Sequence, residues 1–415
     1  MKIRALTGFV DPGWPIEPDR IGNLADCLKS VRDAMVEAGY DVQTLRLATP
    51  PPSEMSSPVK IDERVDFARK LEAECFVQGI DYASIGPILA GDLEGFESIP
   101  EVLKVTESIF TSALYADHEI GLSLNTARSC AEVIHQISTI TSDGFTNLRF
   151  AALANVASGS PFFPASYHRG GPPALAIATE AADLAITAIQ DSSSLRAAAR
   201  LLVETIEGHA AVLSRFTQPI AAQNSVRFWG IDFSFAPFPE ELRSLGAALQ
   251  AFGVPMVGRS GSAAAASFLA TCLDQAKFQR TGFCGLFFPV LEDSVLASSA
   301  AEGSLTITDL LLYATICGTG LDTIALPGNT SPEVLYALLL DLGALALRHD
   351  KPLTARLMPI PGKKAGDEVH FDFEYFADSK VLKLDEQILT DALSESDSIY
   401  ITPHPTETSS THSSP

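Results

Sequence analysis

A histidine and several carboxylates stand at the ends of apolar runs, where acid–base chemistry could take place. His168 follows a predicted strand and an aromatic, proline-flanked turn, and imidazole titrates near neutral pH. Asp232 lies inside an apolar run, where a buried carboxylate needs a partner, and Glu292 directly follows another such run. These three residues are therefore candidate catalytic groups. The alternative interpretation is that His168 has no chemical role, that Asp232 is a buried carboxylate with a structural partner, and that Glu292 is an ordinary charge at a helix start.

Cys317 is a fourth candidate catalytic residue, since it begins a glycine-rich stretch between a predicted helix and a predicted strand. A thiol there could be a nucleophile if its pKa were lowered, and it is otherwise a buried structural thiol. The six cysteines, at positions 27, 75, 130, 272, 284 and 317, show no CxxC spacing. This pattern predicts reduced thiols in a cytoplasmic protein.

A divalent cation, Mg²⁺ or Ca²⁺, could be held by Glu180, Asp183 and Asp293. Residues 174–189 are predicted to be helical, and side chains three apart in a helix share one face. The alternative is a solvated helix edge or pairing of these carboxylates with arginine. The sequence predicts no other cofactor.

An anion anchor is predicted where Arg259, Gly261 and Ser262 join a short predicted strand to an alanine-rich helix. The free N–H groups of a helix start together with a guanidinium favour a carboxylate or phosphate. The alternative is a simple turn with a serine N-cap. Tyr167, beside His168, and Asp322, at the end of the glycine-rich stretch, are further candidate substrate contacts.

Strands alternate with crossover helices along the chain, which predicts an α/β protein with a largely parallel sheet or barrel and helices outside. Within this pattern we expect a helix at 99–110, a strand at 282–290 and a small hairpin at about 367–384. The pattern fits a TIM-like barrel as well as other barrels.

The 415 residues carry a formal charge of −22, with a pI near 4.7. This acidity argues against nucleic acid and anionic membrane surfaces as partners and favours a small-molecule substrate. No apolar stretch reaches the roughly 18 uncharged residues that a membrane span needs. Residues 385–415 contain six acidic residues and no Lys or Arg, and the last part is rich in Ser, Thr and Pro. We therefore expect a largely disordered tail there.

Several motifs resemble the DUF711 family, also called UPF0210, in their order along the chain. They occupy residues 227–237, 244–249, 261–264, 288–293, 317–322, 324–330 and 358–363. The resemblance covers residues 1–384 and implies one large domain similar to the pyruvate formate-lyase-like barrel, with ten strands and helices outside. No glycyl-radical loop occurs near the C-terminus. Two stretches, at 176–183 and 279–285, depart from the glycine- and histidine-containing segments of many bacterial members.

The resulting hypothesis is an enzyme that acts on a small carbonyl- or carboxylate-bearing metabolite by non-redox acid–base chemistry, as a lyase, isomerase or cyclase. The alternative is a non-catalytic binding or regulatory protein with the same barrel. The alanine-rich stretch 174–216 could pack between subunits of a homodimer or higher homo-oligomer.

Overall fold

The computed structural model describes residues 1–316, 318–386, 388–395 and 397–404. Its strands alternate with helices, which confirms the α/β class. The strands are β1 (Lys2–Phe9), β2 (Val42–Ala48), β3 (Tyr82–Ser84), β4 (Ile109–Asp117), β5 (Gly121–Ser123), β6 (Phe150–Ala154), β7 (Ala174–Glu180), β8 (Arg227–Asp232), β9 (Gly320–Pro327), β10 (Leu353–Ile360), β11 (Glu368–Val369), β12 (Ser379–Lys380) and β13 (Ser398–Ile399).

One large sheet runs in the order β8-β7-β1-β2-β3-β4-β6-β10-β9, with β5 paired to β4 and β13. The pairs β7–β8, β1–β2, β2–β3, β3–β4, β4–β6 and β9–β10 are parallel. The pairs β1–β7 and β6–β10 are antiparallel. The sheet is therefore largely parallel, as predicted, with an antiparallel junction near each end.

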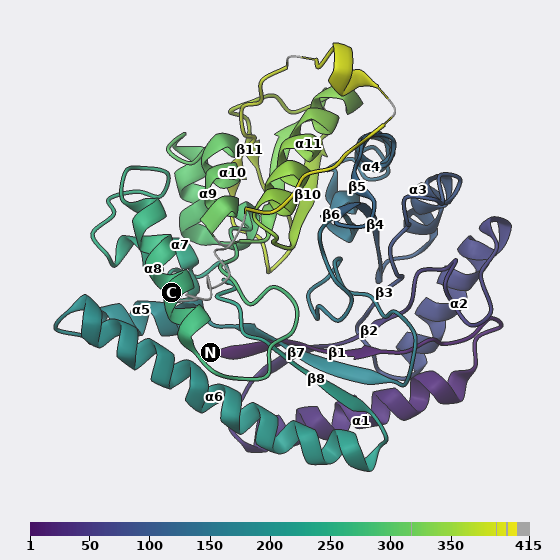
Figure 1. The fold of residues 1–415 in the computed structure, drawn as a ribbon, viewed down its shortest axis with the longest axis horizontal. Helices are drawn as coiled ribbons and strands as arrows, with labels where there is room; N and C mark the ends of the chain where they lie inside the picture. Colours follow the sequence, from purple (N-terminus) through teal and green to yellow (C-terminus); the bar gives the residue numbers. More distant parts are fainter. Residues whose placement is uncertain (317, 387, 396, 405–415) are drawn as a thin grey trace, which may run out of the picture.

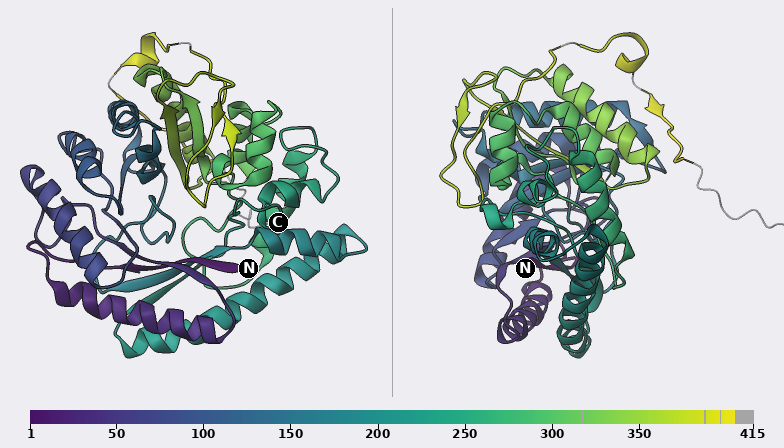
Figure 2. Two further views of the ribbon diagram at one scale, coloured as in Figure 1. Left: turned by 180° about the vertical axis from the view of Figure 1, so that it is seen from behind. Right: turned by 90° about the vertical axis from the view of Figure 1, so that its left-hand side faces the viewer.

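Helices cover the outside of the sheet (Figures 1 and 2). They are α1 (Pro18–Glu37), α2 (Arg64–Val77), α3 (Gly95–Val105), α4 (Leu124–Ile137), α5 (Ala182–Gln190), α6 (Leu195–Gln223), α7 (Leu245–Gln250), α8 (Ser262–Gln275), α9 (Ser294–Ala301), α10 (Ile307–Ile316) and α11 (Pro332–Arg348). In α1, Leu24, Leu28 and Val31 recur at helical spacing and are buried against the sheet, while Pro18 begins the helix. Figure 1 shows α1 and α6 crossing beneath β1, β7 and β8.

Two expected helices are partly strands. Residues 174–180 form β7, which is buried along its whole length between β1 and β8, and α5 begins only after it. Alanine favours helices, but a fully buried apolar segment that pairs on both edges is more stable as a strand. The helix expected at 99–110 ends at Val105, and Ile109 already begins β4.

Residues 280–289 connect both ends of the sheet order without forming a regular strand. Isolated bridges join Arg280 to Ile231 and Leu286 to Phe235 on the β8 side, and Pro289 to Asp322 on β9. The strand expected at 282–290 is therefore replaced by a bridged, irregular segment.

The expected C-terminal hairpin is present as β11 and β12, which pair over two residues each. Beyond it, β13 pairs with β5, so part of the acidic tail contacts the sheet. The disorder expected further on concerns residues 405–415, which lie outside the described residues. The oligomer contact expected at residues 174–216 stays a prediction.

Within the described ranges, every helix is too short or too polar to cross a bilayer.

Candidate functional site

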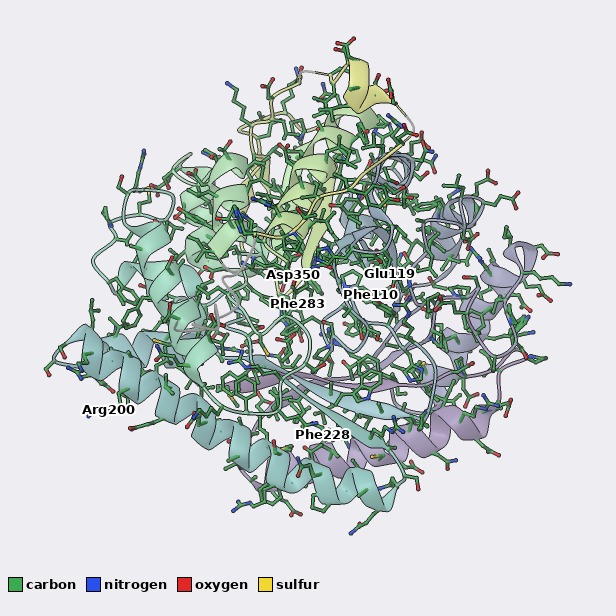
Figure 3. The ribbon with its side chains drawn as sticks, in the orientation of Figure 1. Phe110, Glu119, Arg200, Phe228, Phe283 and Asp350 are labelled. Carbon is green, nitrogen blue, oxygen red and sulfur yellow. The ribbon has the colours of Figure 1, made fainter. Side chains whose placement is uncertain are left out.

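A cavity of about 360 Å³, partly open to solvent, is lined mainly by residues of strands and loops. The charged and aromatic residues that line it are Arg4, Arg46, Arg149, Arg356, Glu107, Glu292, Asp322, Tyr82, Phe110, Phe145, Phe162, Phe163, Phe283, Phe287, Phe373 and Tyr375. Figure 3 shows Phe110 and Phe283 near the middle of the molecule, whereas Arg200 lies on the outside of α6. A cavity of this size, mostly apolar with a few polar groups, is typical of small-molecule sites.

Alternating buried charges form a ladder along one side of this cavity. Arg356, on β10, donates from Nε to Asp322 at 2.5 Å and from Nη2 to Glu292 at 2.7 Å. Glu292 also accepts from Nη2 of Arg4, on β1. The ladder continues from Arg4 to Glu180 at 3.2 Å and on to Arg243. Each of these buried charges thus has an opposite charge beside it, as a low-dielectric interior requires.

The ladder shifts the pKa values of its members in different directions. Burial acts to raise the pKa of Glu292, but Arg356 and Arg4 outweigh burial and hold this pKa below its usual value. Burial likewise opposes the charge of Arg356, yet Asp322 and Glu292 raise its pKa. At Asp322 burial prevails and the pKa is raised, although Arg356 partly offsets the effect. Of the two carboxylates, Asp322 is therefore the one better able to exchange a proton near neutral pH.

Arg46, on β2, faces the same cavity without a carboxylate partner among the described residues. Its Nε donates to Oγ1 of Thr44 at 2.9 Å, and its guanidinium lies over the rings of Phe163 at 5.1 Å and Tyr82 at 5.9 Å. Burial, with a contribution from the charge of Arg4, lowers the pKa of Arg46 to about 10. It thus stays protonated at neutral pH, with both Nη groups available to an anion.

The lining is positively charged in an otherwise acidic protein. Four arginines and three carboxylates face the cavity, which leaves one positive charge, whereas the whole chain carries −22. Glu107 is exposed, and Arg149 donates to the backbone oxygens of Thr106 and Leu103. Arg149 thus has acceptors for both of its Nη groups, and Arg46 is the lining arginine whose Nη groups make no hydrogen bond in the described part of the chain.

Asp232, predicted as catalytic, lies outside the cavity lining and fixes a loop that contributes to the wall. It accepts from the Ser234 hydroxyl at 2.5 Å and from the backbone N–H groups of Phe283 at 2.7 Å and Cys284 at 2.8 Å. The expectation that this buried carboxylate needs partners is confirmed. Burial is the main cause that raises the pKa of Asp232 to about 6.

The raised pKa of Asp232 makes the stability of the protein fall with rising pH. Below the unfolded value of about 3.9 both states hold the proton, and between that value and about 6 only the folded state does. The free energy of unfolding of the wild type, relative to that of Asp232→Asn, should thus decrease by up to about 3 kcal/mol between pH 4 and 7. Urea denaturation of both proteins across this range checks the slope, and a pH-independent difference would contradict it.

His168 and Tyr167 are buried outside the cavity lining. The His168 ring stacks on Trp229, with centroids 5.5 Å apart, and its pKa is lowered mainly by burial. The Tyr167 hydroxyl donates to the backbone oxygen of Val156 at 2.9 Å, and burial raises its pKa to about 12. The catalytic role of His168 stays a prediction, and Cys317 lies outside the described residues.

The predicted anion anchor is a turn at the start of α8, and its residues are not part of the cavity lining. Gly261 has φ +104°, a conformation that favours glycine, and the Ser262 hydroxyl donates to the Arg259 backbone oxygen at 2.8 Å. Arg259 is exposed. The turn of the alternative interpretation is present, but the predicted serine N-cap is wrong, because Gly261 is the N-cap and no side chain of the described residues accepts a capping hydrogen bond there.

The three predicted metal ligands have separate partners. Glu180 ends β7 and binds Arg4, Arg243 and Gln43, so it does not share a helix face with Asp183. Asp183 contacts the N-terminal ammonium group. Asp293 caps α9 by accepting from the backbone N–H groups of residues 295 and 296 and from the Ser244 hydroxyl. Across the described ranges, no group of three or more His, Cys, Asp or Glu side chains could hold a metal ion.

Sequence reasoning found Glu292 and Asp322 but missed the arginines Arg4, Arg46 and Arg356. All three stand in the middle of strands that are otherwise mostly apolar. A charge inside a buried strand needs a partner or a ligand, so this pattern was the available signal.

Comparisons with known proteins place the chain in a family. The model of the family described as "Uncharacterised ACR (DUF711)" matches residues 1–379. A UPF0210 protein of Pyrobaculum islandicum is 30% identical over 394 residues, which cover 88% of this chain and 87% of that protein. UPF0210 proteins of Pyrobaculum aerophilum and Pelotomaculum thermopropionicum are 31% and 28% identical, covering 82% and 85% of this chain and 79% and 82% of theirs.

Among solved structures, the anaerobic ribonucleotide reductase from Thermotoga maritima with citrate in the active site is similar with a TM-score of 0.31 and 9% identity, over 73% of this chain and 66% of that one. The match of the family model to residues 1–379 and the identity to relatives over most of their length agree. The chain belongs to the DUF711, or UPF0210, family.

Proposed function

We propose that this protein is an enzyme that binds a small carbonyl- and carboxylate-bearing metabolite in its interior cavity and converts it by non-redox acid–base chemistry. The observation that carries the proposal is the pairing pattern of the cavity. Every buried charge of the ladder is matched, and among the lining arginines Arg46 is the one whose Nη groups make no hydrogen bond within the described residues. A bound carboxylate would balance Arg46.

In this proposal Asp322 moves the proton. Its raised pKa brings the carboxyl closer to neutral pH, where proton transfer is most efficient. As a base it would take a proton from the carbon beside the substrate carbonyl. Arg356, held by Asp322 and Glu292, would offset the negative charge that develops on the carbonyl oxygen. A lyase, isomerase or cyclase step needs no further reactant than this proton exchange.

Glu292 is assigned a positioning role. It accepts from two guanidiniums and its pKa is held low, so it stays ionised and poorly suited to proton transfer. By holding both Arg4 and Arg356 it fixes the orientation of the groups around Asp322.

The proposal also covers the closure of the sheet, the cellular compartment and the oligomeric state. The sheet would be a closed ten-stranded barrel in which residues 280–289 take the place of the tenth strand, since they bridge to both ends of the sheet order. The protein would work in the cytoplasm as a homo-oligomer; Cys27, Cys75, Cys130, Cys272 and Cys284 are unpaired thiols, which supports a reducing compartment.

The second candidate is a non-catalytic binding protein. Arginines neutralise both Glu292 and Glu180, which favours a binding protein, because networks of paired buried charges can also be purely structural. A binding protein would need Arg46 but would leave its ligand unchanged.

Mass balance separates the two candidates. The purified chain is incubated with a pool of small carbonyl- and carboxyl-bearing metabolites, and each compound is quantified by mass spectrometry before and after. We expect the amount of one compound to decrease and that of a product to increase. When the incubation is carried out in D₂O, deuterium should be incorporated at a carbon of the product. A ligand that co-purifies and is returned unchanged would contradict catalysis.

A further inference from the structure

The walls of the cavity consist largely of aromatic rings arranged in three groups. The first contains Tyr82, Phe110 and Phe163, whose neighbouring ring centroids lie 5.5 and 5.4 Å apart. The second contains Phe162, Phe287 and Phe283, at 4.5 and 5.6 Å. In the third, the Phe373 ring centroid lies 5.1 Å from that of Phe145 and 5.1 Å from that of Tyr375. Aromatic pairs of this kind favour a further ring in a tilted or edge-on arrangement.

The cationic anchor belongs to the first of these groups. The Arg46 guanidinium lies over Phe163 and Tyr82, and its Nε is fixed by Thr44. A guanidinium held in this way offers both Nη groups in one plane, which suits a carboxylate bound through two oxygens. A ligand bound there would extend from Arg46 between the ring groups towards Asp322.

The charge of the cavity limits the ligand to one negative charge. Among the lining residues, Glu292 and Asp322 balance Arg4 and Arg356, and the charge of Glu107 acts on Arg149, so a single carboxylate neutralises the charge that Arg46 leaves over. A second carboxylate would be a buried charge beside Asp322 and Glu292 and without a partner, which is costly. The volume of about 360 Å³ is at the small end of ligand sites, which excludes a ligand as large as a dinucleotide.

We propose that the substrate of this site is a planar monocarboxylate, a single ring or conjugated system with one carboxylate, which Arg46 binds while the three aromatic groups enclose its plane. This inference rests on the proposed function and adds the class of substrate. Phe163, which contacts both Arg46 and Phe110, would be the residue that selects for planarity.

Isothermal titration calorimetry of the full chain with four probes tests the class. Benzoate should bind at least tenfold more tightly than benzamide, which lacks the charge, and than terephthalate, which has a second one. It should also bind at least threefold more tightly than cyclohexanecarboxylate, which is not planar. Arg46→Met should remove the preference for benzoate over benzamide, and Phe163→Leu should remove the preference over cyclohexanecarboxylate.

The control variant is Arg200→Met, which deletes a charge from the exposed face of α6 and should leave all four affinities unchanged. Thermal unfolding of each variant confirms that it is folded, and Phe163→Leu keeps the test valid should Arg46→Met fail to fold. Equal or tighter binding of cyclohexanecarboxylate or terephthalate would overturn the planar monocarboxylate and leave the proposed function standing. Equal binding of benzamide and benzoate, or no binding of any probe, would overturn both.

Discussion

Replacing Asp322 by asparagine is expected to lower kcat at least about 100-fold, since positioned acid–base groups contribute about 10² to 10⁴ in rate. Asparagine keeps an oxygen that can accept from Arg356 Nε, and Arg356 keeps Glu292, so the fold and KM should change little. The pKa of Asp322 is raised, mainly by burial. The wild-type rate should therefore rise with pH through a value above the ordinary 3.9 of an aspartate, as expected of a base. Steady-state kinetics with the metabolite found by mass balance measures both effects.

The matched control for this variant is Asp274→Asn, which makes the same chemical change at an exposed position near the end of α8. Its kcat and pH profile should equal those of the wild type. If Asp322→Asn retained the wild-type rate while remaining folded, Asp322 would not be the acid–base group.

Replacing Glu292 by glutamine is expected to lower the free energy of unfolding by about 3 kcal/mol. Removing one partner of a buried ion pair costs about 3 to 5 kcal/mol, and here the lower value applies. Arg4 keeps Glu180 and Arg356 keeps Asp322, so neither guanidinium loses all of its carboxylates. Urea denaturation at neutral pH measures the difference between the two proteins.

The pH dependence of this loss has a definite sign. The pKa of Glu292 is lowered in the folded state, so its contribution is complete above the unfolded value of about 4.3 and is lost as pH falls below it. The difference between wild type and Glu292→Gln should therefore shrink in acid. Glu132→Gln, an exposed change on α4, should cost less than about 0.5 kcal/mol. A Glu292→Gln protein as stable as this control would show that the ladder contributes nothing to stability.

The regular elements of the fold could be predicted wherever one face of an element is apolar. The alanine-rich helix predicted to follow the turn at Gly261 is present as α8, and the predicted C-terminal hairpin is present as β11 and β12. Local sequence misled at β7, because an alanine-rich segment was assigned by propensity whereas pairing with β1 and β8 determines its structure. Residues 280–289 are the opposite case. Their apolar run predicts a strand, but the segment makes only isolated bridges to its neighbours.

The site could be predicted only in part, because its residues converge from distant segments. Glu292 and Asp322 were found from their positions beside apolar runs, and both line the cavity. The order of the strands determines which arginines pair with these carboxylates. Arg4 comes from β1 and Arg356 from β10, at opposite ends of the chain. A single sequence does not contain this pairing, although the charges in mid-strand are visible in it.

The charge of the cavity lining differs in sign from the charge of the whole protein. The whole chain carries a formal charge of −22, whereas four arginines and three carboxylates line the cavity. If a ligand binds as proposed, its affinity should depend on the local field of the cavity rather than on the charge of the whole protein.

A crystal structure of the protein with 4-bromobenzoate would test this account most directly. Anomalous scattering from bromine locates the ligand independently of any assumption about its orientation. We expect one molecule in the cavity, with its carboxylate hydrogen-bonded to both Nη groups of Arg46 and its ring among Tyr82, Phe110 and Phe163. A ligand bound elsewhere, or in the cavity with its carboxylate away from Arg46, would contradict it.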